Sequence, residues 1–218
     1  YGKIYEYSIN NKNFIVKKPS GEEKDDVRAC YAESMISSIL SAFQSKYLKK
    51  TDYNKKIVPK IYGIIEKPHS EIKLIAMQKF NEDTFRIFER INVNNDSEKD
   101  ILIEMINQIA SHLDILQKHF KFMHNDMKTN NILYKLKNDS EPMSKDNVNF
   151  IITDFGGSTI EFDNNIIKGE VKGNEIYFNK AKDMYLLIHL LITFNKNSFK
   201  NYMIDFFKGI FTNLNLEN

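Results

Sequence analysis

The sequence contains a single cysteine, Cys30, among its 218 residues, so a framework of internal disulfide bonds is excluded. One thiol suits a protein kept in a reducing compartment, and we expect an intracellular, cytoplasmic location. The longest apolar stretches, such as 185–192, fall short of the roughly 20 residues needed to cross a bilayer. The sequence therefore predicts no membrane segment.

A strong excess of charge of one sign is also missing. The 31 basic and 29 acidic residues leave a net charge of only +2, so composition gives no broad electrostatic reason to bind nucleic acid or a membrane surface. We expect the short lysine clusters at 49–50 and 55–56 to be solvated faces, and we expect no direct nucleic-acid binding. Nothing in the composition fixes an oligomeric state.

The first 80 residues combine strand patterns with one helix. Strand-like segments at 4–7 and 14–17 flank an asparagine-rich connection, which predicts a hairpin. Apolar residues then recur at helical spacing over about 25–48, and further strands fit 61–65 and 72–77. This part of the chain is expected to be a small sheet with one helix.

The rest of the chain is mainly helical. A short helix is expected at 84–90, a strong amphipathic helix at about 99–118 and a buried helix at 180–194. Between the last two, strands at 132–134 and 150–153 are expected to form a hairpin across a polar insert. The pattern indicates an α+β fold, with a β-rich part and a helical part on either side of a cleft.

The most informative motif lies before this hairpin. Asp126 is followed by Lys128 and Asn131, and Asp154-Phe155-Gly156 comes at the end of the next strand. Moving a phosphoryl group needs an acceptor for the proton of the attacking hydroxyl, a cation near the phosphate and oxygen ligands for Mg²⁺. Asp126, Lys128, and Asn131 with Asp154 supply these in turn.

With these motifs in this order, the chain resembles the eukaryotic-type protein kinase superfamily in a compact and divergent form, from residue 1 to about 194. The resemblance implies a two-lobed fold, with an ATP-binding N-terminal lobe at 1–80 and a catalytic C-terminal lobe at 81–218. It implies ATP and Mg²⁺ as cofactors, with Asp126 as catalytic base. Because Lys128 is the choice typical of serine/threonine kinases, the expected substrate is a Ser or Thr hydroxyl of a protein.

The resemblance also implies a lysine that holds the α- and β-phosphates. Lys17 in Phe14-Ile15-Val16-Lys17 matches the strand motif that carries this lysine, with Lys18 as a competitor. Since side chains alternate along a strand, only one of the two can face the cleft. The glutamate partner on the following helix would be Glu33.

Further nucleotide contacts are implied along the same cleft. Gly2 resembles the last glycine of a phosphate loop whose first glycines lie outside this sequence. The resemblance implies that Gln78 and Lys79 bind adenine through their backbones, although ordinary core roles stay open for the apolar members of the set. The apolar contacts implied are Ile4, Ile15, Met77 and Leu133.

Two departures limit what the resemblance implies. Asn125 replaces the arginine usual after the catalytic histidine, which removes a cation that would pair with a phosphorylated loop, so activation by loop phosphorylation is not expected. No Ala-Pro-Glu follows Asp154, so peptide specificity does not carry over. Asp183 resembles the buried aspartate that braces the catalytic loop, but a solvated charge at a helix start is the alternative.

Two other functions stay open. One is a small-molecule phosphotransferase of the same fold, although such enzymes often lack the equivalents of Lys128 and Phe155. The other is a catalytically silent pseudokinase scaffold, although every catalytic position is filled by a competent residue. The Asn-rich composition resembles kinases of large DNA viruses or AT-rich protists, and a viral source would imply the host cytoplasm.

Overall fold

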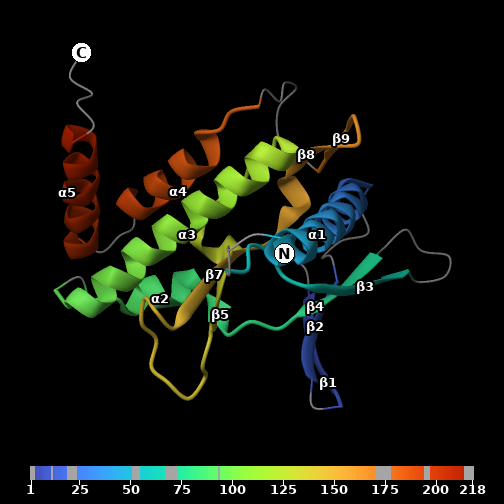
Figure 1. Cartoon of the computed structure of the whole chain (residues 1–218), viewed down its shortest axis with the longest axis horizontal. Coiled ribbons are helices and arrows are strands. Elements are labelled where there is room, and N and C mark those ends of the chain that lie inside the picture. The colour runs from blue at the N-terminus through green and yellow to red at the C-terminus, as the bar shows by residue number, and fades with distance from the viewer. Residues whose placement is uncertain are drawn as a thin grey trace.

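The computed structural model describes residues 3–10, 12–18, 24–50, 55–66, 73–92, 94–169, 178–193 and 197–213, and it has an α+β fold (Figure 1). The four-stranded sheet and helix α1, Lys24–Lys50, lie at one side of the molecule, and the other helices lie at the other side. Within the described residues, no helix is both long enough and apolar enough to span a membrane.

The largest sheet has four antiparallel strands in the order β1-β2-β4-β3. Their bounds are Lys3–Ile9 for β1, Lys12–Lys18 for β2, Ile61–Glu66 for β3 and Lys73–Gln78 for β4. The expected hairpin at the start of the chain is present, but its strands extend further than predicted and its connection is shorter. The polar side chains near this turn are compatible with a strand because all of β1 is exposed.

The register of this sheet decides which side chains share a face. Ile4 lies opposite Lys17, and Ile15 lies opposite Met77. Residues directly opposite each other in an antiparallel pair project to the same side of the sheet. These four side chains therefore lie on one face, and the residues that alternate with them lie on the other.

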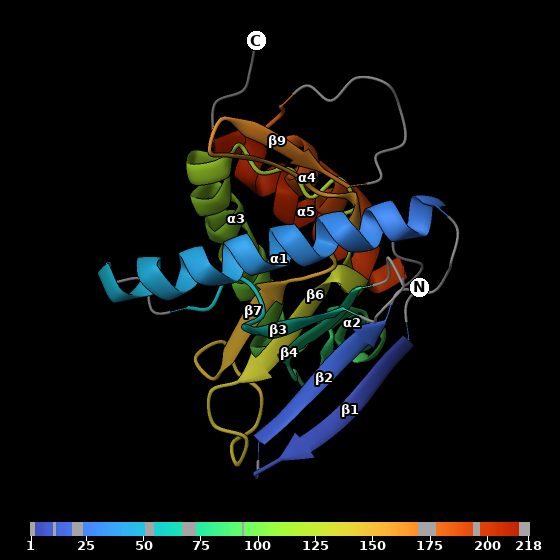
Figure 2. The same cartoon turned by 90° about the vertical axis from the view of Figure 1, so that its right-hand side faces the viewer.

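Helix α1, Lys24–Lys50, runs across this sheet (Figure 2). Ile36 and Leu40, one turn apart, are fully buried and belong to the main core. The helix lies against β3 and β4 and also contacts the turn after β7 and strand β9. It thus touches both the sheet and the second half of the chain.

The remaining helices are α2, Thr84–Arg90, α3, Asp96–Phe120, α4, Lys182–Thr193, and α5, Asn197–Asn213. Helix α3 begins three residues before the expected start, because the Asn95 side chain accepts a hydrogen bond from the Ser97 amide and caps it. The predicted bounds of α2 are confirmed, and the predicted helix at 180–194 corresponds to α4. Helix α5 was not predicted.

Two smaller sheets complete the fold. One joins β5, Glu82–Asp83, to the predicted hairpin of β6, Ile132–Leu136, and β7, Val148–Ile152. The other is the hairpin of β8, Thr159–Phe162, and β9, Asn165–Lys168. This last hairpin was not predicted, and it follows the single helical turn η2, Phe155–Gly157.

Candidate active site

Lys17 lies on an inner strand of the four-stranded sheet, on the face toward α1. Its Nζ atom is 2.6 Å from Oε1 of Glu33 on α1 and 2.8 Å from Oδ1 of Asp154, which follows β7. We call these three residues the lysine triad. Lys18 is exposed on the opposite face because side chains alternate along a strand. The structure therefore selects Lys17 over Lys18, and the expected pairing with Glu33 is present.

The charges of the lysine triad offset the cost of burial at two of its three members. Burial alone would lower the pKa of Lys17, but the carboxylates of Glu33 and Asp154 outweigh it and the pKa is raised. Burial would raise the pKa of Asp154, but the Lys17 cation outweighs that effect and lowers the pKa. At Glu33 burial dominates and raises the pKa, although Lys17 acts in the opposite direction. Lys17 is therefore charged at neutral pH.

A second polar group lies in the loop before β6. Lys128 places Nζ 2.7 Å from Oδ2 of Asp126, and Asn131 donates from Nδ2 to the Asp126 carbonyl oxygen at 2.8 Å and to Oδ2 at 3.0 Å. We call Asp126, Lys128 and Asn131 the loop cluster. The Asp126 side chain is 54% exposed, so this carboxylate can reach a molecule arriving from solvent.

Asp183 holds the backbone of this loop. It is fully buried at the start of α4, and its two carboxylate oxygens accept hydrogen bonds from the amides of His124, at 2.7 Å, and Asn125, at 2.9 Å. The alternative of a solvated helix charge was wrong. A buried carboxylate with two backbone donors fixes the direction of the chain just before Asp126.

The loop cluster and the lysine triad are joined through the strand end between them. His124 places Nε2 2.8 Å from the carbonyl oxygen of Thr153, and the Thr153 amide donates to the Asn131 carbonyl oxygen at 3.0 Å. Asp154 follows with a backbone φ of 65°, in the left-handed region. These contacts place the backbone of Asn131 beside Thr153, the residue before Asp154. A shared metal role for Asn131 and Asp154 stays a prediction.

Phe155 anchors the segment after Asp154. Its ring is buried and lies 6.0 Å from the ring of Phe122 and 5.8 Å from the ring of His124, centre to centre. Helix α1 contacts the same turn, so Phe155 packs beneath α1. Gly169 closes the turn from the other side: a Cβ atom there would lie 1.8 Å from the carbonyl oxygen of Gly156, so only glycine fits.

Asn131 and Asp154 fit a magnesium ion by the chemistry of their donors. Magnesium prefers oxygen ligands and is usually held by one or two protein groups together with water and phosphate. Asn131 turns its Nδ2 toward Asp126, which leaves its amide oxygen for a cation. Within the described residues, no group of three or more His, Cys, Asp or Glu is arranged around a metal position.

The residues predicted to contact adenine are brought together only in part. The register puts Ile4, Ile15 and Met77 on the face that carries Lys17, with Met77 buried and Ile4 exposed. Gly2 lies outside the described residues. Leu133 lies on β6, which belongs to a separate sheet.

The end of β4 departs from what was expected. The amide of Gln78 donates to the Lys60 carbonyl oxygen at 2.9 Å and is therefore not free to bind adenine. The Lys79 side chain forms an ion pair with Glu6 on β1. If this segment binds adenine through its backbone, the Gln78 amide is therefore not one of the groups that does so.

A cation that sequence reasoning missed lies beside Asn125. Lys182, on α4, donates from Nζ to Oδ1 of Asn125 at 2.8 Å, while Nδ2 of Asn125 donates to the carbonyl oxygen of Gly157 at 3.0 Å. Lys182 thus places a cation next to Asn125 that the sequence did not predict, and the expectation about loop phosphorylation stays a prediction. Lys182 lies 57 residues away in the chain, and no local pattern could have revealed the contact.

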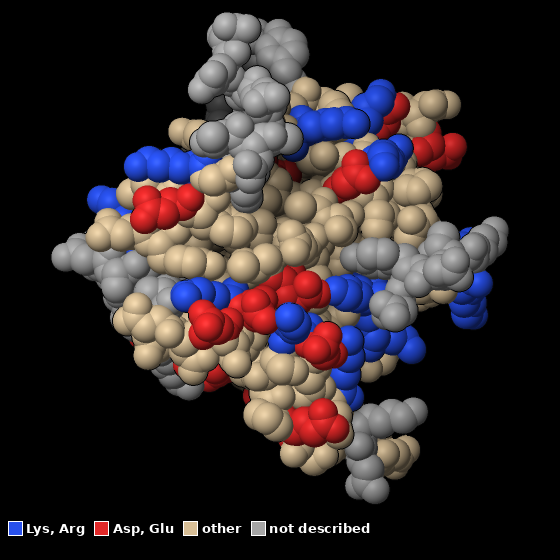
Figure 3. All heavy atoms as spheres, turned by 60° about the vertical axis from the view of Figure 1, so that its left-hand side comes forward, with Lys and Arg blue, Asp and Glu red and all other residues tan. Residues whose placement is uncertain are grey.

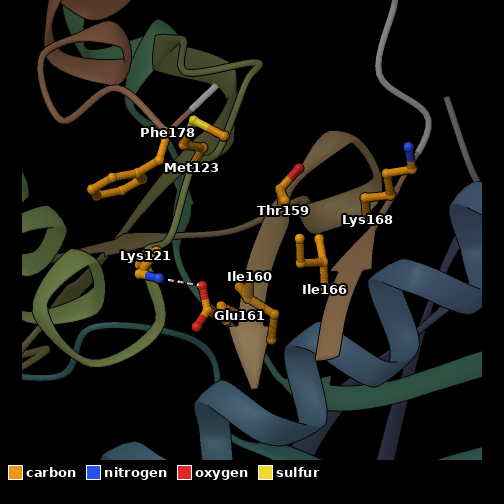
Figure 4. Close-up of a pocket in the computed structure, with 8 residues that line it drawn as sticks. All are labelled: Lys121, Met123, Thr159, Ile160, Glu161, Ile166, Lys168 and Phe178. Atoms are coloured by element: carbon orange, nitrogen blue, oxygen red, sulfur yellow. Dashed lines mark hydrogen bonds and ion pairs between the residues drawn. The ribbon is translucent and has the colours of Figure 1, made fainter. Parts of the chain in front are cut away.

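The unpredicted hairpin β8–β9 forms a pocket of about 290 Å³ next to this position (Figure 4). The pocket has an apolar lining and a polar rim, on which Lys121 pairs with Glu161 at 2.6 Å. Its signal in the sequence was the alternation of apolar residues around Asp163-Asn164, a pair with positive φ that suits a tight hairpin turn. The apolar residues that line it are Met123, Ile160, Ile166 and Phe178.

On the face of the molecule shown in Figure 3, acidic and basic side chains are intermixed, with a broad uncharged area between two charged bands. A comparison with protein-family models finds no matching family, and a comparison with curated proteins finds no matching sequence. The function of the chain must therefore be inferred from the geometry of its site.

Proposed function

We propose that this chain is a phosphotransferase with the two-lobed architecture of protein kinases, and that it transfers the γ-phosphoryl group of ATP to Ser or Thr hydroxyls of proteins. The observation that carries the proposal is the lysine triad, which ties Lys17 to Glu33 and to Asp154. In this proposal the ATP-binding lobe is 1–80, the catalytic lobe is 81–218, and the nucleotide lies between them.

Lys17 and Asp154 would hold the phosphate end of the nucleotide. Lys17 is charged, is positioned by Glu33 and can donate to phosphate oxygens. Asp154 and Asn131 would hold Mg²⁺, which, when bound, neutralises charge on the phosphates. This division explains why a carboxylate and a lysine share one site, since each binds a different part of the same ligand.

Asp126 would receive the proton of the attacking hydroxyl. Both of its side-chain hydrogen bonds go to Oδ2, so we assign Oδ1 to the substrate hydroxyl. Lys128 lies at 2.7 Å and would stabilise negative charge that develops on the phosphoryl group. Asp183 and Asn131 form hydrogen bonds to the loop backbone and so keep the Asp126 carboxylate in place. Neither residue is expected to hold the substrate.

The test is transfer of label from γ-labelled ATP, with Mg²⁺, into generic protein substrates rich in Ser and Thr. We expect labelled protein from the unaltered chain. Asp126→Asn should abolish transfer while leaving ATP binding nearly intact, because the side chain keeps its size but loses its basicity. Asp154→Asn should weaken Mg²⁺-dependent ATP binding itself.

The outcomes separate the alternatives. Label in small hydroxyl compounds but not in protein would replace the proposal with a small-molecule phosphotransferase. Binding of ATP without any transfer would favour a pseudokinase scaffold. Equal loss of binding and transfer in Asp126→Asn, with a normal fold by circular dichroism, would contradict the assigned roles.

A further inference from the structure

The face of the four-stranded sheet opposite to Lys17 carries aromatic and basic side chains. Register and alternation place Tyr5 and Tyr7 of β1 on this side, together with Phe14 of β2. We call this side the outer face. Its remaining described members on β1 and β2 are Lys3, Ile9, Val16 and Lys18.

The aromatic residues of the outer face form a row that solvent can reach. Tyr7 stacks on Phe14 with ring centres 5.6 Å apart, and Phe14 meets the ring of Tyr62 edge-on at 6.4 Å. Tyr5, Tyr7 and Tyr62 are 43%, 49% and 52% exposed. Aromatic side chains are normally buried for their large apolar area, so a row of exposed rings marks a surface for binding.

The charges beside this row are basic. Lys3 and Lys18 lie opposite each other across β1 and β2, and Nζ of Lys60 lies 5.6 Å from the centre of the Tyr62 ring. Lys56 reaches the side chain of Gln78, the residue opposite Phe14, at 3.4 Å. Partial burial lowers the pKa of Lys56, and the cations of Lys135 and Lys60 lower it further. Lys56 and Lys60 thus lie at this end of the row.

Carboxylates are segregated to the opposite side of the sheet. Glu6 lies opposite Ile15, on the Lys17 face, and Glu66 lies opposite Lys73 on that same face. Within the described residues of the four strands, the outer face carries no Asp or Glu. The net charge of +2 hides this separation because it averages over the whole chain.

We propose that the outer face binds single-stranded nucleic acid, with bases stacked on Tyr7 and Tyr62 and phosphates held by the lysines. Unpaired bases offer the flat apolar surface that exposed rings bind, and the backbone offers the negative charge that lysines bind. An acidic peptide would use the lysines but leave the rings without partners. A second copy of the chain would bring two basic faces together, which is electrostatically unfavourable.

This activity is independent of the proposed phosphoryl transfer and is tested without ATP. The probe is a fluorescein-labelled 12-nucleotide single-stranded oligonucleotide, and its anisotropy is followed as the whole chain is added at several salt concentrations. We expect saturable binding that weakens as salt rises, as counterion release requires. A duplex of the same length should bind more weakly, because its bases are not available for stacking.

Two kinds of substitution distinguish stacking from charge. Tyr7→Ala and Tyr62→Ala should each weaken binding about 5- to 150-fold, the loss that one base stack on an aromatic ring represents. Lys60→Ala should lower the slope of log affinity against log salt by about 0.7, the value for one phosphate contact with a single strand. The matched control is Tyr185→Ala on α4, where the ring is exposed and stacked on His189, and binding should not change.

Five results would overturn the proposal. The first is an absence of saturable binding at low salt. The second is a duplex that binds as tightly as the single strand. The third is that Tyr7→Ala and Tyr62→Ala both bind like the unaltered chain, although circular dichroism shows that they are folded. The fourth is that polyglutamate displaces the labelled oligonucleotide as well as unlabelled oligonucleotide does at the same concentration of negative charge, which would indicate an acidic protein partner. Concentration-dependent self-association lost in Tyr7→Ala would instead identify a second copy as the occupant.

Discussion

The lysine triad and the loop cluster are built in opposite ways. The lysine triad joins three segments that are far apart in the chain, and its Lys17 and Glu33 side chains are only 18% and 9% exposed. The loop cluster spans six residues and leaves the Asp126 side chain open to solvent. The first arrangement joins side chains from distant segments, whereas the second joins side chains that are close in the chain, on a loop whose backbone Asp183 holds. We therefore expect damage to the triad to appear in stability and damage to the cluster to appear in chemistry.

The largest effect on stability is expected from Lys17→Met. The substitution leaves Glu33 and Asp154 close together without the cation between them, so the free energy of unfolding should fall by about 3–5 kcal/mol. Urea denaturation measures this difference. Lys18→Met, on the exposed outer face, should change the free energy by less than about 0.5 kcal/mol, and equal effects of the two substitutions would contradict a stabilising role for the triad.

Asp183→Ala tests the support of the loop cluster. The amides of His124 and Asn125 would lose their acceptor in a buried position, which should lower the free energy of unfolding by about 2–4 kcal/mol. Asp183→Asn keeps one oxygen acceptor and should lose less. Asp205→Ala, on the exposed side of α5, is the control and should leave the urea midpoint unchanged. A shift no larger than that of the control would mean that the loop holds its own conformation.

His112 lies in neither the lysine triad nor the loop cluster, and we expect it to make the stability of the protein depend on pH. Burial lowers the pKa of this residue to about 3, with a smaller contribution from Lys55, so the folded protein keeps it neutral. The unfolded chain takes up a proton near its ordinary pKa of about 6.5, so stability is full above that pH. Below it, stability should fall by up to about 1.4 kcal/mol per pH unit as the pH approaches the folded pKa.

Denaturation curves at pH 7, 6, 5 and 4.5 check this slope. His112→Gln should reduce it, whereas His119→Gln, on the exposed side of the same helix, should retain it. An unchanged slope in His112→Gln would assign the acid sensitivity to carboxylates. With the histidine removed, the remaining slope would report on carboxylates whose pKa is lowered in the fold, such as Asp154 and Glu104.

The smallest change in stability is expected from Lys128→Ala. The ion pair with Asp126 joins side chains that are 22% and 54% exposed, and solvent screens such pairs, so the free energy of unfolding should change by less than about 1 kcal/mol. Thermal denaturation followed by circular dichroism is sufficient to measure it. A loss comparable to that of Lys17→Met would show that the loop cluster is also a stabilising centre.

Local patterns predicted most of the elements and several of the pairings. The bounds of α2 and the hairpin β6–β7 followed from periodicity, and the ion pair of Lys17 with Glu33 followed from the resemblance. Helix α5 and the hairpin β8–β9 were not predicted, although both carry local signals, such as Met203 and Phe207 one turn apart. Periodicity alone was therefore sufficient to reveal these two elements as well.

Contacts between distant segments could not be predicted in the same way. The bond of Lys182 to Asn125 and the pairing of the Gln78 amide with Lys60 depend on how elements pack. The outer face was missed for a different reason. A net charge sums over the chain and carries no information on which side of a sheet each charge lies.

The contact of Gly169 with Gly156 couples the end of β9 to the turn that follows Asp154. Backbone touches backbone there, and the Gly169 amide also donates to the Ser158 carbonyl oxygen at 2.8 Å, so no side chain is available to yield between the two segments. A displacement of β9 must therefore carry the turn after Asp154 with it. The hairpin β8–β9 is thereby coupled through backbone contacts to the residues that directly follow Asp154.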